Sequence, residues 1–162
     1  MLLLLAFVSS AQEDTKLTKL QKQHLQMYVV TQKALRSERP NHKKIFSAYY
    51  AFIANSNKQM YPINQRNAAA HLEKAQRALA ENKKVLVEKH RVAATYFDAM
   101  AKKNENIVTA FEKMNINKLQ ELVGNYIELE KQMQSLGLTP LPREWFSTQE
   151  ARLIIKQQQA KR

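Results

Sequence analysis

By residue type, the four histidines (His24, His42, His71 and His90) are the side chains best suited to metal binding or proton transfer. Two ligands on one helix point the same way only when they are three or four residues apart. No histidine shares a predicted helix with an Asp, a Glu or another His at that spacing, and Glu88 and His90 are only two apart. The sequence therefore predicts no metal site, leaving open one assembled from distant segments. We interpret His24 as a partly buried bundle residue and the other histidines as solvated.

Other catalytic patterns are also missing from the sequence. Glu128 and Glu130 are two residues apart and point to different sides of their predicted helix. The sequence has no glycine-rich phosphate loop and no Gly-x-Ser-x-Gly elbow. Because it has no cysteine, thiol catalysis, iron–sulfur clusters and cysteine-ligated zinc are excluded. We therefore expect a protein that is not an enzyme, without a cofactor or a small-molecule substrate.

The composition predicts an all-α fold in a single domain, residues 12–162. The chain has only two glycines and four prolines in 162 residues, whereas strands joined by tight turns need more of both. Its abundant residues are Lys, Gln, Ala, Leu and Glu, which are good helix formers.

A seven-residue spacing predicts one long central helix, from about Pro62 to Met114. Seven residues are close to two helical turns, so side chains at this spacing share one edge of a helix. A helix of that length would be on the order of 75 Å long. The polar run 102–106 could interrupt it, but the spacing continues through that run. The expected architecture is an elongated antiparallel bundle around this helix, with Leu72, Leu79 and Leu86 as a seam for a partner. The spaced residues are Leu72, Leu79, Leu86, Ala93, Met100, Ile107 and Met114.

Shorter helices are predicted on either side of the central one. The first runs from a cap at Asp14 or Thr15 to about Ser37, and the second from Asn41 to about Ser56, with its end frayed by residues 55–57. A fourth helix covers 118–136, capped by Asn115 or Asn117 and ended by Gly137. The last helix starts at the capping box of Ser147 and Glu150. Trp145 and Phe146 are predicted to anchor its small apolar patch.

Residues 1–11 (MLLLLAFVSSA) have the pattern of an export signal. An apolar run is followed by small residues at Ser9 and Ala11, and the run is too short to span a bilayer. No Lys or Arg precedes the leucines, which is atypical of such signals. We expect export to a bacterial periplasm or cell envelope, or secretion, with the mature chain starting at Gln12. The alternative is that the segment is kept as a short hydrophobic plug or anchor.

The formal charge of +12 has two interpretations: an anionic partner or neighbour, or a scattered excess of lysine on solvated helix faces. The clearest candidate patch combines Lys43 and Lys44 with Tyr50, a pairing that suits an anionic membrane surface or a nucleic acid. Nucleic acid is disfavoured if residues 1–11 are a signal, because exported proteins seldom meet it. The simpler interpretation is that the lysines are solvated, Tyr49 is in the core and Tyr50 is half exposed.

In size, leader, charge and helical content the chain is similar to the small periplasmic chaperones of bacterial envelopes. Leu17-Thr18-Lys19-Leu20-Gln21 resembles the Leu-Thr-x-x-Gln motif of one such group, whereas Thr139-Pro140 lacks the expected glutamine. This general resemblance does not make the chain a member.

The leading hypothesis is an exported, non-enzymatic protein that binds other proteins as a subunit or scaffold of an envelope assembly. The first alternative is a soluble periplasmic chaperone or carrier of anionic lipids or unfolded clients. The second is an intracellular nucleic-acid-associated protein, which requires that residues 1–11 are not a signal.

Overall fold

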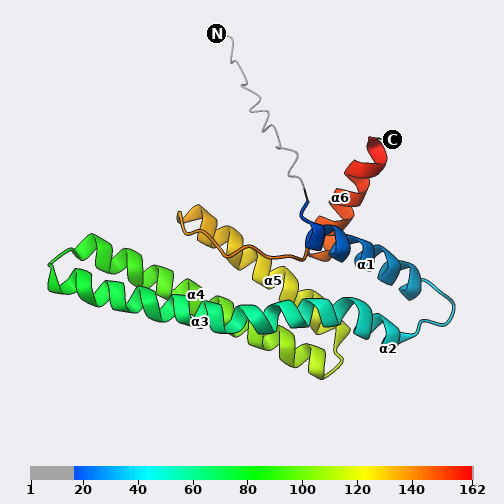
Figure 1. Ribbon diagram of the computed structural model, residues 1–162, viewed down its shortest axis with the longest axis horizontal. Helices are drawn as coiled ribbons and strands as arrows, with labels where there is room; N and C mark the ends of the chain where they lie inside the picture. Colours follow the sequence, from blue (N-terminus) through cyan, green and yellow to red (C-terminus); the bar gives the residue numbers. More distant parts are fainter. Residues whose placement is uncertain (1–16, 162) are drawn as a thin grey trace, which may run out of the picture.

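The computed structural model describes residues 17–161, and every regular element in that range is helical (Figure 1). This confirms the predicted all-α helical bundle. The predicted signal segment, residues 1–11, lies outside the described residues. In chain order the elements are α1 (Lys19–Leu35), α2 (His42–Ile45), the π-helical turn η1 (Phe46–Tyr50), α3 (Ala51–Ala80), α4 (Lys84–Glu112), α5 (Ile116–Ser135) and α6 (Thr148–Ala160).

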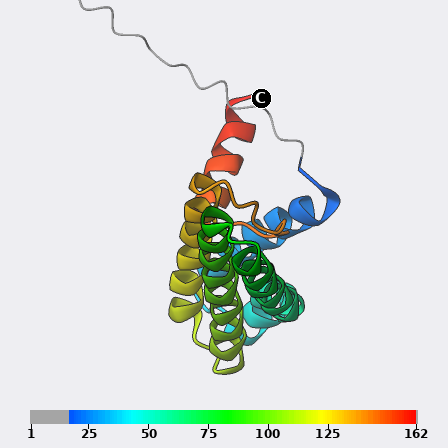
Figure 2. The ribbon, with the colours of Figure 1, turned by 90° about the vertical axis from the view of Figure 1, so that its left-hand side faces the viewer.

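The long central helix predicted from Pro62 to Met114 is wrong, because the chain reverses after Ala80. In its place α3 and α4 pack side by side as an antiparallel hairpin (Figures 1 and 2). Asn82 takes a left-handed conformation, with φ at 56°. The Lys83 N–H donates to the Ala78 carbonyl at 2.9 Å and the Asn82 N–H to the Leu79 carbonyl at 3.0 Å. These two bonds form a Schellman motif that ends α3 without glycine.

The seven-residue spacing describes a buried edge in α4 only. Ala93, Met100 and Ile107 are fully buried there, and the polar run 102–106 is helical as expected. Leu72 and Leu79 lie on α3 instead, and the spacing reaches Leu86 only by crossing the turn. The periodicity is therefore continuous in the sequence but not along one helix.

α3 begins earlier than predicted, because the expected break at residues 55–57 does not occur. Asn57 is fully buried inside α3, and its Nδ2 donates to the Ile53 carbonyl at 2.8 Å. Its Oδ1 accepts from Asn104 of α4 at 2.7 Å. A polar residue that looked like a helix end is thus paired inside the bundle. Pro62 also lies within α3 rather than at its start, although an interior proline removes one helical hydrogen bond.

Several predicted caps are confirmed. The side chains of Asn41 and Asn115 each accept a hydrogen bond from the amide three residues on, at 3.0 Å in both cases. Ser147 and Glu150 form the predicted capping box, and Gly137 is left-handed with φ at 69°. The predicted cap of the first helix at Asp14 or Thr15 is wrong: α1 begins at Lys19 and is capped by Thr18, which forms a second capping box with Gln21. The Leu-Thr-x-x-Gln pattern is therefore a helix start here.

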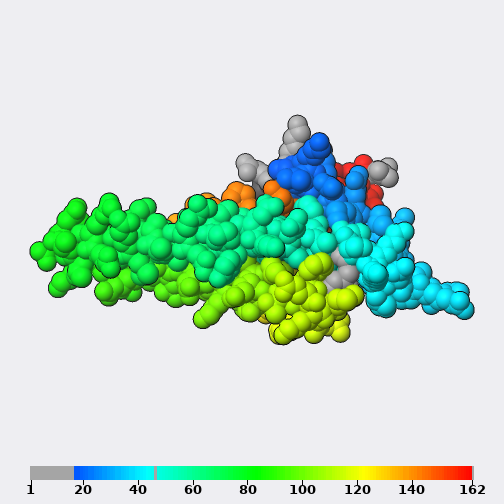
Figure 3. Space-filling view, turned by 60° about the horizontal axis from the view of Figure 1, so that its bottom comes forward, coloured from blue at the N-terminus to red at the C-terminus, as the bar shows by residue number. Residues whose placement is uncertain are grey.

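The remaining helices gather around the inner half of the hairpin. α5 packs along α4, and α1 and α2 contact η1 at the end where α3 begins (Figure 1). The outer half of the hairpin, from about residue 66 to residue 91, extends away from α1, α2 and α6 (Figure 3). The molecule is therefore an elongated bundle with a projecting two-helix arm.

Candidate functional site

Large apolar side chains are exposed on the projecting arm of the hairpin. The exposed fraction is 52% for Leu72, 56% for Leu79, 82% for Val85 and 41% for Leu86. Leu72 and Leu79 share one face of α3, next to the buried Ala68 and Ala75, whereas Val85 and Leu86 begin α4. We call Leu72, Leu79, Val85 and Leu86 the hairpin surface. The three predicted seam leucines all belong to it, but they come from two helices.

The arm that carries the hairpin surface is strongly basic. Residues 66–91 contain seven Lys and Arg against three Glu, a net charge of +4. Arg77 pairs with Glu73 and Lys83 with Glu81, but both pairs are exposed and contribute little stability. Exposed apolar residues in a basic setting favour a partner that combines apolar and acidic groups. A second copy would bring the same positive charge to the contact.

A groove lies beside the hairpin surface, between the start of α4 and the end of α5. Val85 and Val92 line one side and Leu136 and Leu138 the other, with Glu88 and Lys89 also at its wall. Its volume is about 400 Å³. Val85 and Leu136 are half or more exposed, so the groove opens to the surface. It extends the apolar area of the hairpin surface toward α5.

The predicted cationic and aromatic patch is only half formed. Lys43 and Lys44 are exposed on α2, but Tyr50 is only 2% exposed and its hydroxyl accepts from Gln120 of α5 at 3.2 Å. Tyr49 is buried, as the simpler interpretation expected. The prediction that Tyr50 lies at the surface is wrong, because η1 turns both tyrosines inward. Tyr50 therefore does not share an exposed surface with the two lysines.

Trp145 and Phe146 are buried, in the connector before α6. Trp145 packs against Tyr126 of α5, with ring centroids 5.3 Å apart. The Phe146 N–H donates to Nδ1 of His24 at 2.9 Å, which joins this connector to α1. Both residues thus attach the C-terminal segment to the bundle.

The buried polar groups between α3 and α4 form an amide ladder. Asn104 donates to Asn57 at 2.7 Å and accepts from Asn64 at 2.8 Å, and all three side chains are fully buried. These bonds fix the register of the two helices, since a shift of one turn would leave several amide groups unpaired. Nothing in the ladder is nucleophilic or charged. The sequence offered no signal for it, because isolated asparagines look like caps or helix ends.

The burial of the four histidines agrees only in part with the interpretation from the sequence. His24 is fully buried and His42 is exposed, whereas His71 and His90 are half-buried and face each other across the hairpin. Within residues 17–161, no group of three or more His, Cys, Asp or Glu side chains is placed to hold a metal ion. None of the helices described there is long and apolar enough to cross a membrane.

Comparison with known proteins found no match: no family model fits the chain, and no curated protein or solved structure is similar to it. The candidate site is therefore defined by the geometry of this chain alone.

Proposed function

We propose that this is a non-enzymatic binding protein whose projecting hairpin docks onto another protein, as a subunit or scaffold of an assembly. The observation that carries the proposal is the hairpin surface: large apolar side chains are exposed on an arm that extends away from α1, α2 and α6 (Figure 3). An exposed Leu gains roughly 1.5–3 kcal/mol when fully buried, so three or four such side chains could anchor an interface.

The charge of the arm favours one kind of partner over another. The net charge of +4 over residues 66–91 favours a partner with apolar anchors surrounded by acidic groups. It disfavours self-association through the same surface. The export pattern of residues 1–11 supports a location in a bacterial envelope, and this part of the proposal rests on the sequence alone.

The test is crosslinked affinity purification of the native protein, with mass spectrometry of partners and of the mature N-terminus. The variant Leu79→Asp/Leu86→Asp places two negative charges on the hairpin surface. Leu153→Asp is the matched control, because Leu153 is 54% exposed on α6, away from the arm. We expect a stoichiometric partner with the wild type and with Leu153→Asp, and its loss with the double variant.

Two results would contradict the proposal. One is a folded double variant that retains its partner in full. The other is a broad, substoichiometric set of clients or lipids that is lost in salt and on Lys43→Glu/Lys44→Glu, which would favour the carrier function.

A mature chain that starts at Gln12 would support export, whereas recovery of an intact Met1 peptide would rule out cleavage.

A further inference from the structure

His71 and His90 meet across the hairpin, one from each helix. Their Nδ1 atoms are 3.1 Å apart and their ring centroids 5.3 Å apart. The two residues are separated by 19 positions, and only the turn after Ala80 brings them together. This is a contact between distant segments, which the spacing along a single helix could not reveal.

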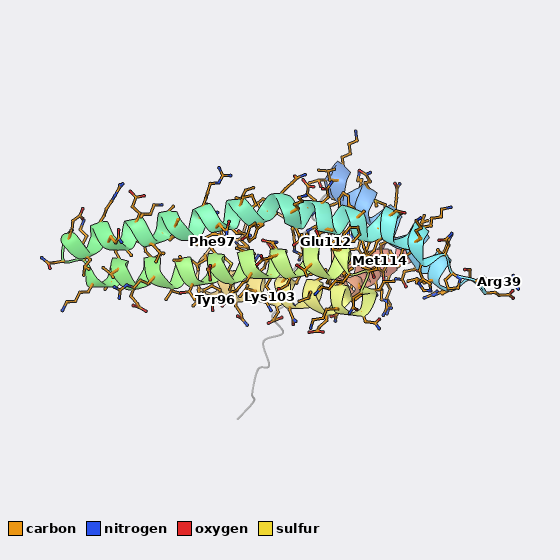
Figure 4. The ribbon with its side chains drawn as sticks, turned by 90° about the horizontal axis from the view of Figure 1, so that it is seen from below. Arg39, Tyr96, Phe97, Lys103, Glu112 and Met114 are labelled. Carbon is orange, nitrogen blue, oxygen red and sulfur yellow. The ribbon has the colours of Figure 1, made fainter. Side chains whose placement is uncertain are left out.

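The position of His71 is fixed by an aromatic neighbour. Its ring stacks on Phe97 of α4, with centroids 5.5 Å apart and an interplanar angle of 21°. Phe97 lies between α3 and α4, so the stack is supported from within the hairpin (Figure 4). The His71 ring is therefore positioned by packing.

The surroundings of His71 favour its neutral form by lowering its pKa. Burial lowers the pKa of His71, and the nearby Lys74 and His90 lower it further. A neutral imidazole keeps a lone pair on one ring nitrogen, which is the form that binds metals. In the contact of the two rings, one Nδ1–H must donate to the other Nδ1, because two bare lone pairs would repel.

We propose that His71 and His90 form a two-imidazole chelate that binds a divalent transition metal such as Zn²⁺ or Ni²⁺ through both Nδ1 atoms. Metal–nitrogen bonds of about 2.0–2.1 Å place neighbouring nitrogen ligands about 2.9–3.4 Å apart, for angles from square-planar to tetrahedral. The observed separation of 3.1 Å falls in this range, and because centroids 5.3 Å apart place the rings nearly end to end, both rings must rotate slightly to direct their Nδ1 lone pairs at one ion. On binding, the ring that donates moves its proton from Nδ1 to Nε2, so the neutral pair releases no net proton.

Water completes the coordination of the metal ion, because the described residues supply no third His, Cys, Asp or Glu ligand beside His71 and His90. Lys74 disfavours a nearby cation, and no carboxylate offsets it. We therefore expect moderate affinity and an open site, unlike the closed four-ligand sites of structural zinc. This inference is independent of the proposed protein-binding function.

Calorimetric titration of the untagged full-length chain with ZnCl₂, and separately with NiCl₂, tests the site. We expect one equivalent of metal per chain. His71→Ala and His90→Ala should each weaken binding by more than about tenfold, because each removes a direct ligand. His42→Ala is the matched control and should leave binding unchanged, because His42 is exposed and stands apart from the pair.

A second measurement does not depend on how the variants fold. In a long-range ¹H–¹⁵N spectrum of the wild type, ZnCl₂ should shift the Nδ1 resonances of two histidines and leave the other two unchanged. The proposal is overturned if the wild type binds neither metal at millimolar concentration. It is also overturned if binding survives both alanine substitutions, or if the shifted resonances belong to His24 or His42.

Discussion

At the scale of single residues, the most constrained side chain is His24. It is fully buried, and the rings of Tyr49 and Phe52 stack on it. Its Nδ1 accepts from the Phe146 N–H, so its proton must be on Nε2. That Nε2 atom is buried and has no hydrogen-bond partner among residues 17–161. Burial, then repulsion from Arg143, lowers the pKa of His24 to about 4, although the carboxylate of Glu150 acts in the opposite direction.

This pKa predicts an acid-sensitive fold. The unfolded chain binds a proton at His24 below about pH 6.5 while the folded chain does not, so stability should fall between about pH 6.5 and 4. The loss from this residue is on the order of 3 kcal/mol. Urea unfolding followed by circular dichroism at several pH values should show a flatter pH dependence in His24→Gln. His42→Gln should keep the wild-type slope, and equal slopes in all three proteins would refute the assignment.

At the scale of elements, three helices end in the same left-handed motif with three different residues. The left-handed residue lies two positions beyond the end of each helix: Asn82 after α3, Met114 after α4 and Gly137 after α5, with φ values of 56°, 52° and 69°. At Met114 the Asn115 N–H donates to the Ala110 carbonyl at 3.0 Å and the Met114 N–H to the Phe111 carbonyl at 2.9 Å. Glycine suits this position and asparagine tolerates it, whereas methionine is strained there by roughly 1–2 kcal/mol.

Met114→Gly should therefore raise the free energy of unfolding. The gain should be about 0.5–1 kcal/mol, because relief of strain exceeds the extra freedom of glycine in the unfolded chain. Met114 is 56% exposed at the end of α4, so little packing is lost (Figure 4). Met114→Ala is the control: it removes the same side chain but keeps the strain, and should give no gain. A stabilisation shared by both variants would show that side-chain exposure, not backbone strain, is responsible.

At the scale of the whole molecule, Arg143 connects the C-terminal segment to the bundle. It pairs with Glu130 of α5, donates to Glu150 of α6 at 2.8 Å and donates to the Trp145 carbonyl at 2.7 Å. Glu130 is buried, and burial raises its pKa despite the pairing with Arg143. For Glu150, burial is outweighed by its bonds to Arg143 and Ser147, which lower its pKa. One guanidinium thus bridges two carboxylates from two helices.

Arg143→Ala should be among the most destabilising single changes. It leaves Glu130 as an uncompensated buried charge, at a cost of about 3–5 kcal/mol. Arg152→Ala, at an exposed position on α6, should change stability by less than about 0.5 kcal/mol. Urea denaturation measures both, and hydrogen exchange should show faster opening of α6 and α1 in Arg143→Ala. Equal stability of the two variants would contradict this role.

The sequence by itself determined the helical class, the caps at Asn41, Asn115 and Ser147, and the left-handed end at Gly137. These features depend only on residues within a few positions of each other, because local hydrogen bonds and helix propensity control them. Only the tertiary structure decided that the chain reverses at Asn82, that Asn57 is buried rather than a helix end, and that His71 meets His90. Asparagine fits a turn, a cap or a buried ladder equally well, and its role depends on which distant group is available to pair with it.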